Sequence, residues 1–197
     1  MYQEETGKMA KAKPITGLDI HAPVGKNARI IARERLNEMY TWSSFADAPY
    51  RVRELHDLRI AAKRLRYTLE VFEDVLPEEC KAAVKELEQL QDELGSLHDS
   101  DVMIALLRLC LSAHDSGKGY EPAHMKGRTL LRPEMVATVL DPAAAPSAEE
   151  RYGLEQMLHQ QEHLREEQYA AFRRHWHELQ ARDFRRHLLS LFDSSSV

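Results

Sequence analysis

Four cationic or titratable side chains follow one side of a helix that the sequence predicts at residues 50–76. On a helical wheel of about 100° per residue they form a stripe about 15 Å long, made of His56, Arg59, Lys63 and Arg66. Cations in such a line repel one another, and partial burial strengthens the repulsion. The spacing therefore predicts a groove that holds an extended anion.

Two apolar strips flank this stripe. The expected core strip consists of Leu58, Ala62, Leu65, Leu69 and Phe72, and the strip on the other side consists of Ile60, Tyr67 and Val71. Cations between two apolar strips indicate the wall of a groove or pore. The alternative interpretation is snorkelling side chains that bridge to acids on neighbouring helices, such as Glu70, Glu73 or Asp74.

A second set of cations repeats the same three-then-four spacing on a helix predicted at 24–45: Lys26, Arg29 and Arg33. We expect the two rows to face each other across one channel. Arginine binds phosphate oxygens in forked pairs, lysine acts as a compact point charge, and His56 would add charge at lower pH. A long polyphosphate needs such a line of cations and no single catalytic centre.

The elements that position these rows are all predicted to be helices. Further helices are expected at 78–94, 99–112, 148–180 and 181–192, with Gly95 separating the first two and Asp99 and Asp101 capping the helix that follows. No stretch alternates with period two. The fold class is therefore all-α, a helical bundle with long amphipathic helices and a basic central groove or channel.

The domain organisation follows from the distribution of glycine and proline. Residues 1–22 are expected to form a loose N-terminal arm, and 23–197 a single helical domain. A variable connection rich in glycine and proline interrupts this domain at 113–148, with a short helix at about 129–139.

Composition limits the environment in which the chain works. The net charge of −5 argues against a polyanion binder when taken alone, but the charges are unevenly distributed. Cys80 and Cys110 are too few for a disulfide framework, so we expect a reducing, cytoplasmic compartment. No signal peptide or membrane span is predicted.

The segment at 56–67, HDLRIAAKRLRY, followed by LEVF, resembles the signature helix of the CHAD family, the conserved histidine α-helical domain. Residues 94–102, LGSLHDSDV, resemble the next recurring piece of that family, and 148–192 resemble its closing helix loosely through AFRRHW at 171–176. The resemblance implies a helical bundle whose basic channel binds inorganic polyphosphate, often on polyphosphate granules, without catalysis.

By motif position, the resemblance assigns ligand roles to His56, Arg59, Lys63, Arg64 and Arg66, and less tightly to Lys26, Arg29 and Arg33. Family members usually carry two signature halves, whereas residues 113–197 do not repeat the signature found here. We therefore hypothesise a homodimer that supplies both walls of the channel. Arg165 and Arg173, on the C-terminal helices, are added as candidate ligands.

Other functions remain open at this stage. The pairs His56–Asp57 and His98–Asp99 raise a metal-dependent HD-type phosphohydrolase, but adjacent residues lie about 100° apart on a helix and do not converge. A helical protein-interaction module, whose cations only bridge carboxylates, is a further alternative. His159 and His163 lack a third zinc ligand. We expect no metal, no cofactor, no enzymatic activity, no membrane association and no nucleic-acid partner.

Overall fold

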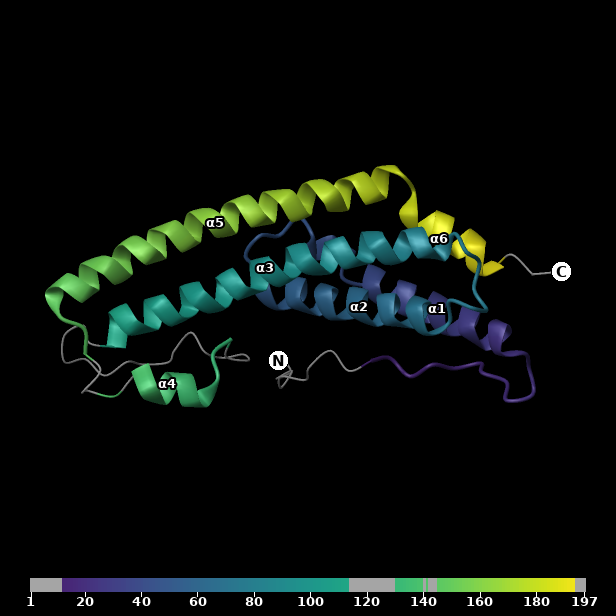
Figure 1. Cartoon of the computed structure of the whole chain (residues 1–197), viewed down its shortest axis with the longest axis horizontal. Coiled ribbons are helices and arrows are strands. Elements are labelled where there is room, and N and C mark those ends of the chain that lie inside the picture. Colours follow the sequence, from purple (N-terminus) through teal and green to yellow (C-terminus); the bar gives the residue numbers. More distant parts are fainter. Residues whose placement is uncertain (1–11, 114–129, 140, 142–144, 194–197) are drawn as a thin grey trace, which may run out of the picture. The chain divides into compact units, whose positions relative to one another are not determined.

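A computed structural model describes residues 12–113, 130–139, 141 and 145–193 of the 197-residue chain. Its helices are α1 (Val24–Tyr40), the short 3-10 turn η1 (Ser43–Phe45), α2 (Val52–Val71), α3 (Cys80–Ala113), α4 (Pro133–Val139), α5 (Ala148–Ala181) and α6 (Phe184–Asp193) (Figure 1). The described residues form helices and turns and contain no strand. The predicted all-α class is therefore confirmed.

The chain divides into two compact units. The bundle unit comprises the described residues of Met9–Gly95 and Tyr169–Val197, and the hairpin unit comprises those of Ser96–Gln168. Each of the helices α3 and α5 has one part in the bundle unit and the other part in the hairpin unit. Every cation of the two predicted rows lies in the bundle unit.

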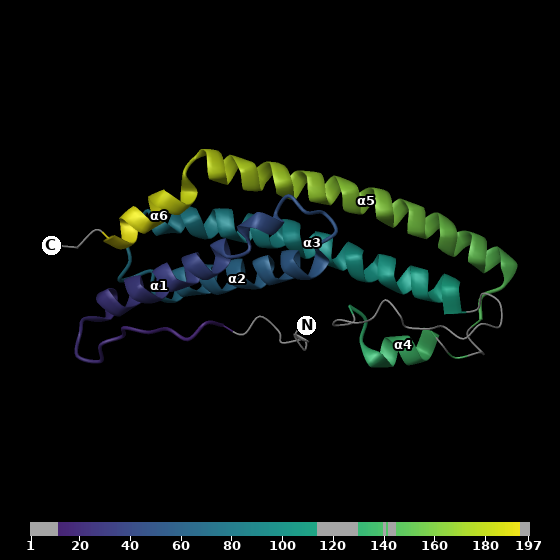
Figure 2. The ribbon, with the colours of Figure 1, turned by 180° about the vertical axis from the view of Figure 1, so that it is seen from behind.

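In the bundle unit, α1 packs against α2 and α6, and both views of the ribbon show α1 and α2 side by side (Figures 1 and 2). The contact uses small and apolar side chains that are fully or almost fully buried: Ala28, Ala32, Leu36 and Met39 on α1, with Leu58, Ala61, Ala62, Leu65 and Leu69 on α2. Alanines on both helices let the two backbones approach closely.

The sequence prediction of two helices at 78–94 and 99–112 is wrong, because α3 runs without a break from Cys80 to Ala113. A glycine inside a helix costs about 1 kcal/mol relative to alanine. The buried stripe continues past Gly95 at helical spacing, through Leu87, Leu90, Leu94, Leu97 and Ile104. Burial of this stripe outweighs the glycine penalty. Asp99 and Asp101 consequently lie inside α3 and cap no helix.

In the hairpin unit, the second part of α3 pairs antiparallel with the first part of α5. A buried polar layer fixes this pairing: Ser100 donates to Gln168 at 2.7 Å, and Arg165 Nε lies 2.5 Å from Asp101 Oδ1. At its start, α5 carries a capping box, in which the backbone N–H groups of Ser147 and Glu150 each bond to the other's side chain. Among the described residues, each helix is too short or too polar to cross a lipid bilayer.

Candidate functional site

The α2 row, which comprises His56, Arg59, Lys63 and Arg66, is half-buried along its whole length. On its core side lie the buried leucines Leu58, Leu65 and Leu69. On the other side, Tyr67 and Val71 are exposed, so that edge of the row opens to solvent. Lys63 Nζ and the Arg66 guanidinium lie 5.4 and 5.0 Å from the centre of the Tyr67 ring, which stabilises both cations.

Arg59 lies against the backbone of α3. A Cβ atom added to Gly95 would meet Arg59 Nε at 3.5 Å and Nη2 at 3.7 Å. Arg59 Nε is buried and has no hydrogen-bond acceptor within the part of the chain that the structure describes. A buried guanidinium N–H without an acceptor is costly, and a bound anion would satisfy it.

The α1 row comprises Lys26, Arg29 and Arg33. Its last cation, Arg33, lies near the level along the bundle axis of Arg66, the last cation of the α2 row. The contact of Gly25 with Val75 and the ion pair of Glu38 with Arg64 set the antiparallel register of α1 and α2. This register brings Arg33 about level with Thr68. The two rows therefore follow one another along the axis instead of lying opposite each other, as the spacing had led us to expect.

The first part of α3 lies near cations of both rows. Burial raises the pKa of the Cys80 thiol to about 11, with Glu79 adding to this rise and the nearby positive charge of Arg29 opposing it. Further along α3, Arg66 contacts Glu88 and Arg59 contacts Gly95. These three places on α3, Cys80, Glu88 and Gly95, span 15 residues of one helix, or about 23 Å. We call the α1 row and the α2 row together the basic line.

Carboxylates approach this line at its exposed edges. Arg33 pairs with Asp193 at the end of α6, and both side chains are exposed. Arg66 lies 3.6 Å from Glu70 and 3.4 Å from Glu88, through Nε and Nη1 respectively. In contrast, neither Arg59 nor Lys63 makes an ion pair with any residue that the structure describes.

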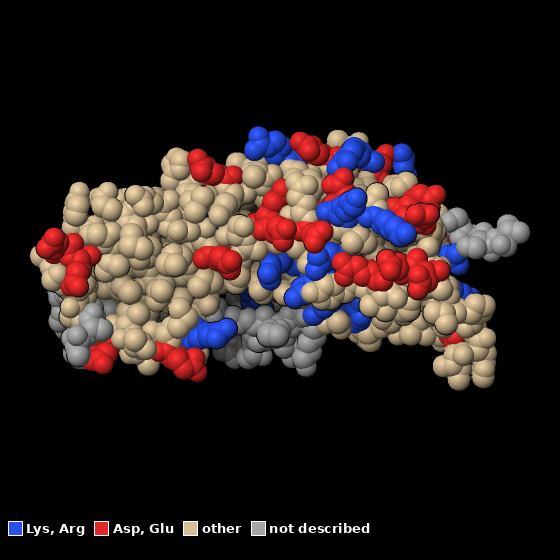
Figure 3. Space-filling view, in the orientation of Figure 1, with Lys and Arg blue, Asp and Glu red and all other residues tan. Residues whose placement is uncertain are grey.

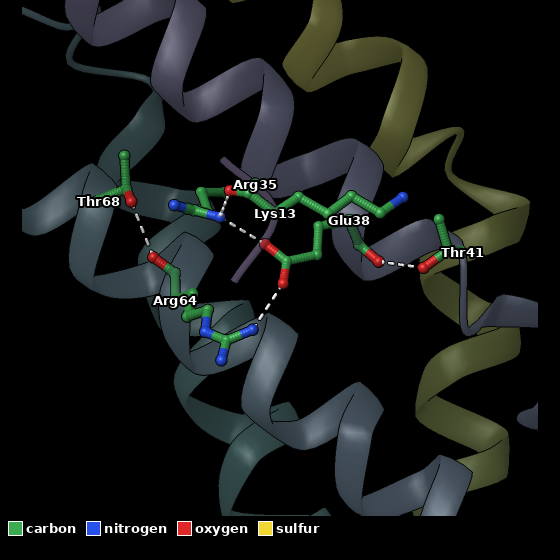
Figure 4. A network of polar contacts seen from close by, with 6 residues as sticks. All are labelled: Lys13, Arg35, Glu38, Thr41, Arg64 and Thr68. Atoms are coloured by element: carbon green, nitrogen blue, oxygen red, sulfur yellow. Dashed lines mark hydrogen bonds and ion pairs between the residues drawn. The ribbon is translucent and has the colours of Figure 1, made fainter. Parts of the chain in front are cut away.

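Arg64, predicted as a ligand by motif position, contacts a buried acid. Glu38, whose side chain is 5% exposed, accepts from Arg64 Nη1 at 2.6 Å and from Arg35 Nη1 at 2.7 Å (Figure 4). Arg35 also donates to the Lys13 carbonyl. This Glu38 clasp, made of Arg35, Glu38 and Arg64, ties α1, α2 and the segment before α1 together. The structure therefore separates Arg64 from the α2 row.

The structure also pairs the two candidate ligands on α5 with carboxylates. Arg165 is buried on Asp101 in the hairpin unit. Arg173 lies 2.6 Å from Asp47, which His177 also contacts at 2.8 Å. These two hydrogen bonds lower the pKa of the Asp47 carboxyl. Both arginines therefore have carboxylate partners of their own.

Sequence reasoning did not identify a buried histidine between two acids. His175 on α5 is 6% exposed, with Nδ1 2.8 Å from Glu93 and Nε2 3.0 Å from Glu86, both on α3. Burial lowers the pKa of His175, but the two carboxylates raise it more, so the net pKa lies above 6.5. The signal in the sequence was its place within the stripe of Phe172, Trp176 and Leu179, where the helical period predicts a buried side chain.

Acids and bases lie side by side on the surface over the bundle unit, where Lys and Arg gather next to a line of Asp and Glu (Figure 3). Two of the acids on α3, Glu88 and Asp92, are exposed and stand one helical turn apart on the same side as Gly95. In the described ranges, no three His, Cys, Asp or Glu side chains gather as a metal site would require.

A family model for the CHAD domain matches residues 8–108, which is half of the chain and includes both rows. The chain belongs to the CHAD family. The match contains α1, α2 and most of α3, the elements that build the basic line of this CHAD chain. Searches of curated proteins and of solved structures find no match.

Proposed function

We propose that this chain binds inorganic polyphosphate along the basic line and performs no chemistry on it. The observation that carries the proposal is the state of Arg59 and Lys63. The chain has 32 acidic residues and 27 basic ones, yet these two half-buried cations have no carboxylate partner in the described part of the chain. A ligand that brings its own negative charge supplies that partner.

The shape of the site favours a long anion over a compact one. Its cations are spread over about 25 Å on two consecutive helices. A phosphate chain can meet them one after another, with forked pairs at the arginines and a point contact at Lys63. Membership of the CHAD family supports the same ligand class.

A second candidate function is a helical protein-interaction module whose cations only bridge acids. The exposed pairs of Arg33 with Asp193 and Arg66 with Glu88 favour it. The HD-type phosphohydrolase has less support, because Asp57 is buried and adjacent residues diverge by about 100° on α2.

The test compares wild type with Arg59→Gln/Lys63→Gln, and uses Arg108→Gln/Arg151→Gln as a control with the same change in net charge. Both control arginines lie in the hairpin unit and make ion pairs there. We expect the first variant to lose at least about tenfold in affinity for long-chain polyphosphate, with unchanged helicity, and the control to stay within about twofold. Equal affinity in all three proteins would contradict the proposal. Loss of helicity in the first variant would favour structural bridging.

Two parts of the proposal concern assembly. We propose that the chain forms a homodimer, because the family signature occurs once at 56–67 and a second copy would supply a second wall. Light scattering with saturating polyphosphate should then give twice the monomer mass, and a monomer with bound ligand would overturn the idea. Association with polyphosphate granules would follow from the same binding site and is measured by co-sedimentation.

A further inference from the structure

Arg66 differs from its neighbours on the α2 row because acids already contact it. Its side chain is 18% exposed, while those of Glu70 and Glu88 are 41% and 58% exposed. These acids come from two helices, Glu70 from α2 and Glu88 from α3. By the register of α1 and α2, Arg66 lies close to where the two rows meet, in the middle of the basic line.

The contacts at Arg66 are looser than those that hold the fold together. Its nitrogens lie 3.4 and 3.6 Å from the carboxylate oxygens, whereas the Glu38 clasp has distances of 2.6 and 2.7 Å. Ideal charge-assisted hydrogen bonds measure about 2.7–2.9 Å. Exposed carboxylates keep most of their hydration and turn away at little cost. Glu70 and Glu88 can therefore be displaced, and Glu38 cannot.

We propose that Glu70 and Glu88 are internal competitors for Arg66, and that they make the site select long phosphate chains over short ones. The inference rests on the proposed function. A short anion that contacts Arg66 has to displace the two carboxylates with few other contacts to hold it there. A long chain already held at Arg59 and Lys63 presents its next phosphates to Arg66 at a high effective concentration, so that it competes with the carboxylates more effectively.

The experiment measures the affinities of tripolyphosphate and long-chain polyphosphate for wild type and for Glu70→Gln/Glu88→Gln. We expect the variant to bind tripolyphosphate about tenfold more tightly and the long chain about two- to threefold more tightly. The preference for length should therefore fall by about threefold to fivefold.

Two controls separate competition at Arg66 from a general change in charge. Glu155→Gln/Glu162→Gln removes two acids in the hairpin unit, and Glu155 lies 3.6 Å from Arg151 at the same four-residue spacing that joins Arg66 and Glu70. We expect this control to shift both affinities by less than twofold. The second control repeats Glu70→Gln/Glu88→Gln in an Arg66→Gln background, where the gain should disappear.

The outcomes separate the two proposals. If wild type binds long-chain polyphosphate but Glu70→Gln/Glu88→Gln binds both ligands as wild type does, the competitor role is wrong and polyphosphate binding stands. A gain that persists in the Arg66→Gln background also overturns the competitor role. If none of the proteins binds either ligand, the proposed function fails, and this inference fails with it.

Discussion

The Glu38 clasp joins α1 to α2, and the α2 row lies on the second of these helices. Both contain arginine, but their cations are in different states. In the clasp, two arginines meet one carboxylate that is 5% exposed, at 2.6 and 2.7 Å. In the row, Arg66 meets only exposed acids at longer distances, and Arg59 and Lys63 meet none that the structure describes. Burial of the acid, more than the number of cations, separates an arginine that stabilises the fold from one that is available to a ligand.

The largest expected effect comes from removing the acid of the clasp. Glu38→Ala leaves Arg35 and Arg64 partly buried without their shared carboxylate, which should lower the free energy of unfolding by about 3 kcal/mol. Urea unfolding followed by circular dichroism measures the change. Affinity for polyphosphate, normalised to folded protein, should stay within about twofold. A loss below 1 kcal/mol would mean that the clasp is no stronger than a surface pair.

The cluster of His175, Glu86 and Glu93 should make the free energy of unfolding depend on pH. The folded pKa of His175 is raised, so its contribution is fully present below about pH 6.5 and is lost as pH rises through the folded value. Burial raises the pKa of Glu86, but its hydrogen bonds with His175 and Arg182 together lower it more, so the net pKa is lowered. Its contribution is therefore lost as pH falls below about 4.5.

We therefore expect the free energy of unfolding to be highest between about pH 5 and 6.5. His175→Gln should cost about 2 kcal/mol in that window, because two carboxylates then share a neutral partner. The variant should also lose most of the decline above pH 6.5. Urea titrations at a series of pH values give both results, and an equal decline in variant and wild type would show that other groups cause it.

The adjacent residues Lys63 and Arg64 test the comparison directly, because one belongs to the α2 row and the other to the Glu38 clasp. Arg64→Gln should lower the free energy of unfolding by about 1–2 kcal/mol and leave polyphosphate affinity within about twofold. Lys63→Gln should do the reverse, with a fivefold to tenfold loss of affinity and a stability change below about 0.5 kcal/mol. Unfolding and calorimetric titration of both variants provide the measurements. Equal losses of polyphosphate affinity in the two variants would show that Arg64 also binds the ligand.

The smallest effect is expected at Gly95. Alanine is a better helix former than glycine by about 1 kcal/mol, and its Cβ would meet Arg59 at ordinary contact distances of 3.5 and 3.7 Å. Gly95→Ala should thus stabilise the protein by about 0.5–1 kcal/mol and change affinity by less than about threefold. A destabilised variant would show that the Arg59 side chain cannot adjust to the added methyl group.

The sequence allowed the helices and the α2 row to be predicted because both depend on local periodicity. The helical period of α2 placed Arg59, Lys63 and Arg66 together, and the structure keeps them along one edge. The break expected at Gly95 did not occur, because the apolar stripe continues through it and tertiary burial outweighs local propensity.

Most of the cation pairs were not predictable, because they depend on contacts between distant segments. Arg64 and Glu38 are 26 residues apart, and Arg165 and Asp101 are 64 apart. The positions of the two rows along the bundle axis also depend on the register of α1 against α2. A helical wheel describes one helix and cannot predict that register. For His175, the burial was visible from its place in an apolar stripe, but the pairing with Glu86 and Glu93 was not.

The measurement that tests the central claim most directly is the binding of long-chain polyphosphate and of single-stranded DNA of equal charge, at low and physiological salt, with hydrolysis followed in the same samples. The account predicts tight, salt-sensitive binding of polyphosphate, much weaker binding of DNA and no turnover. Equal binding of both polymers would reduce the basic line to a general cationic surface, and binding of neither would contradict the account.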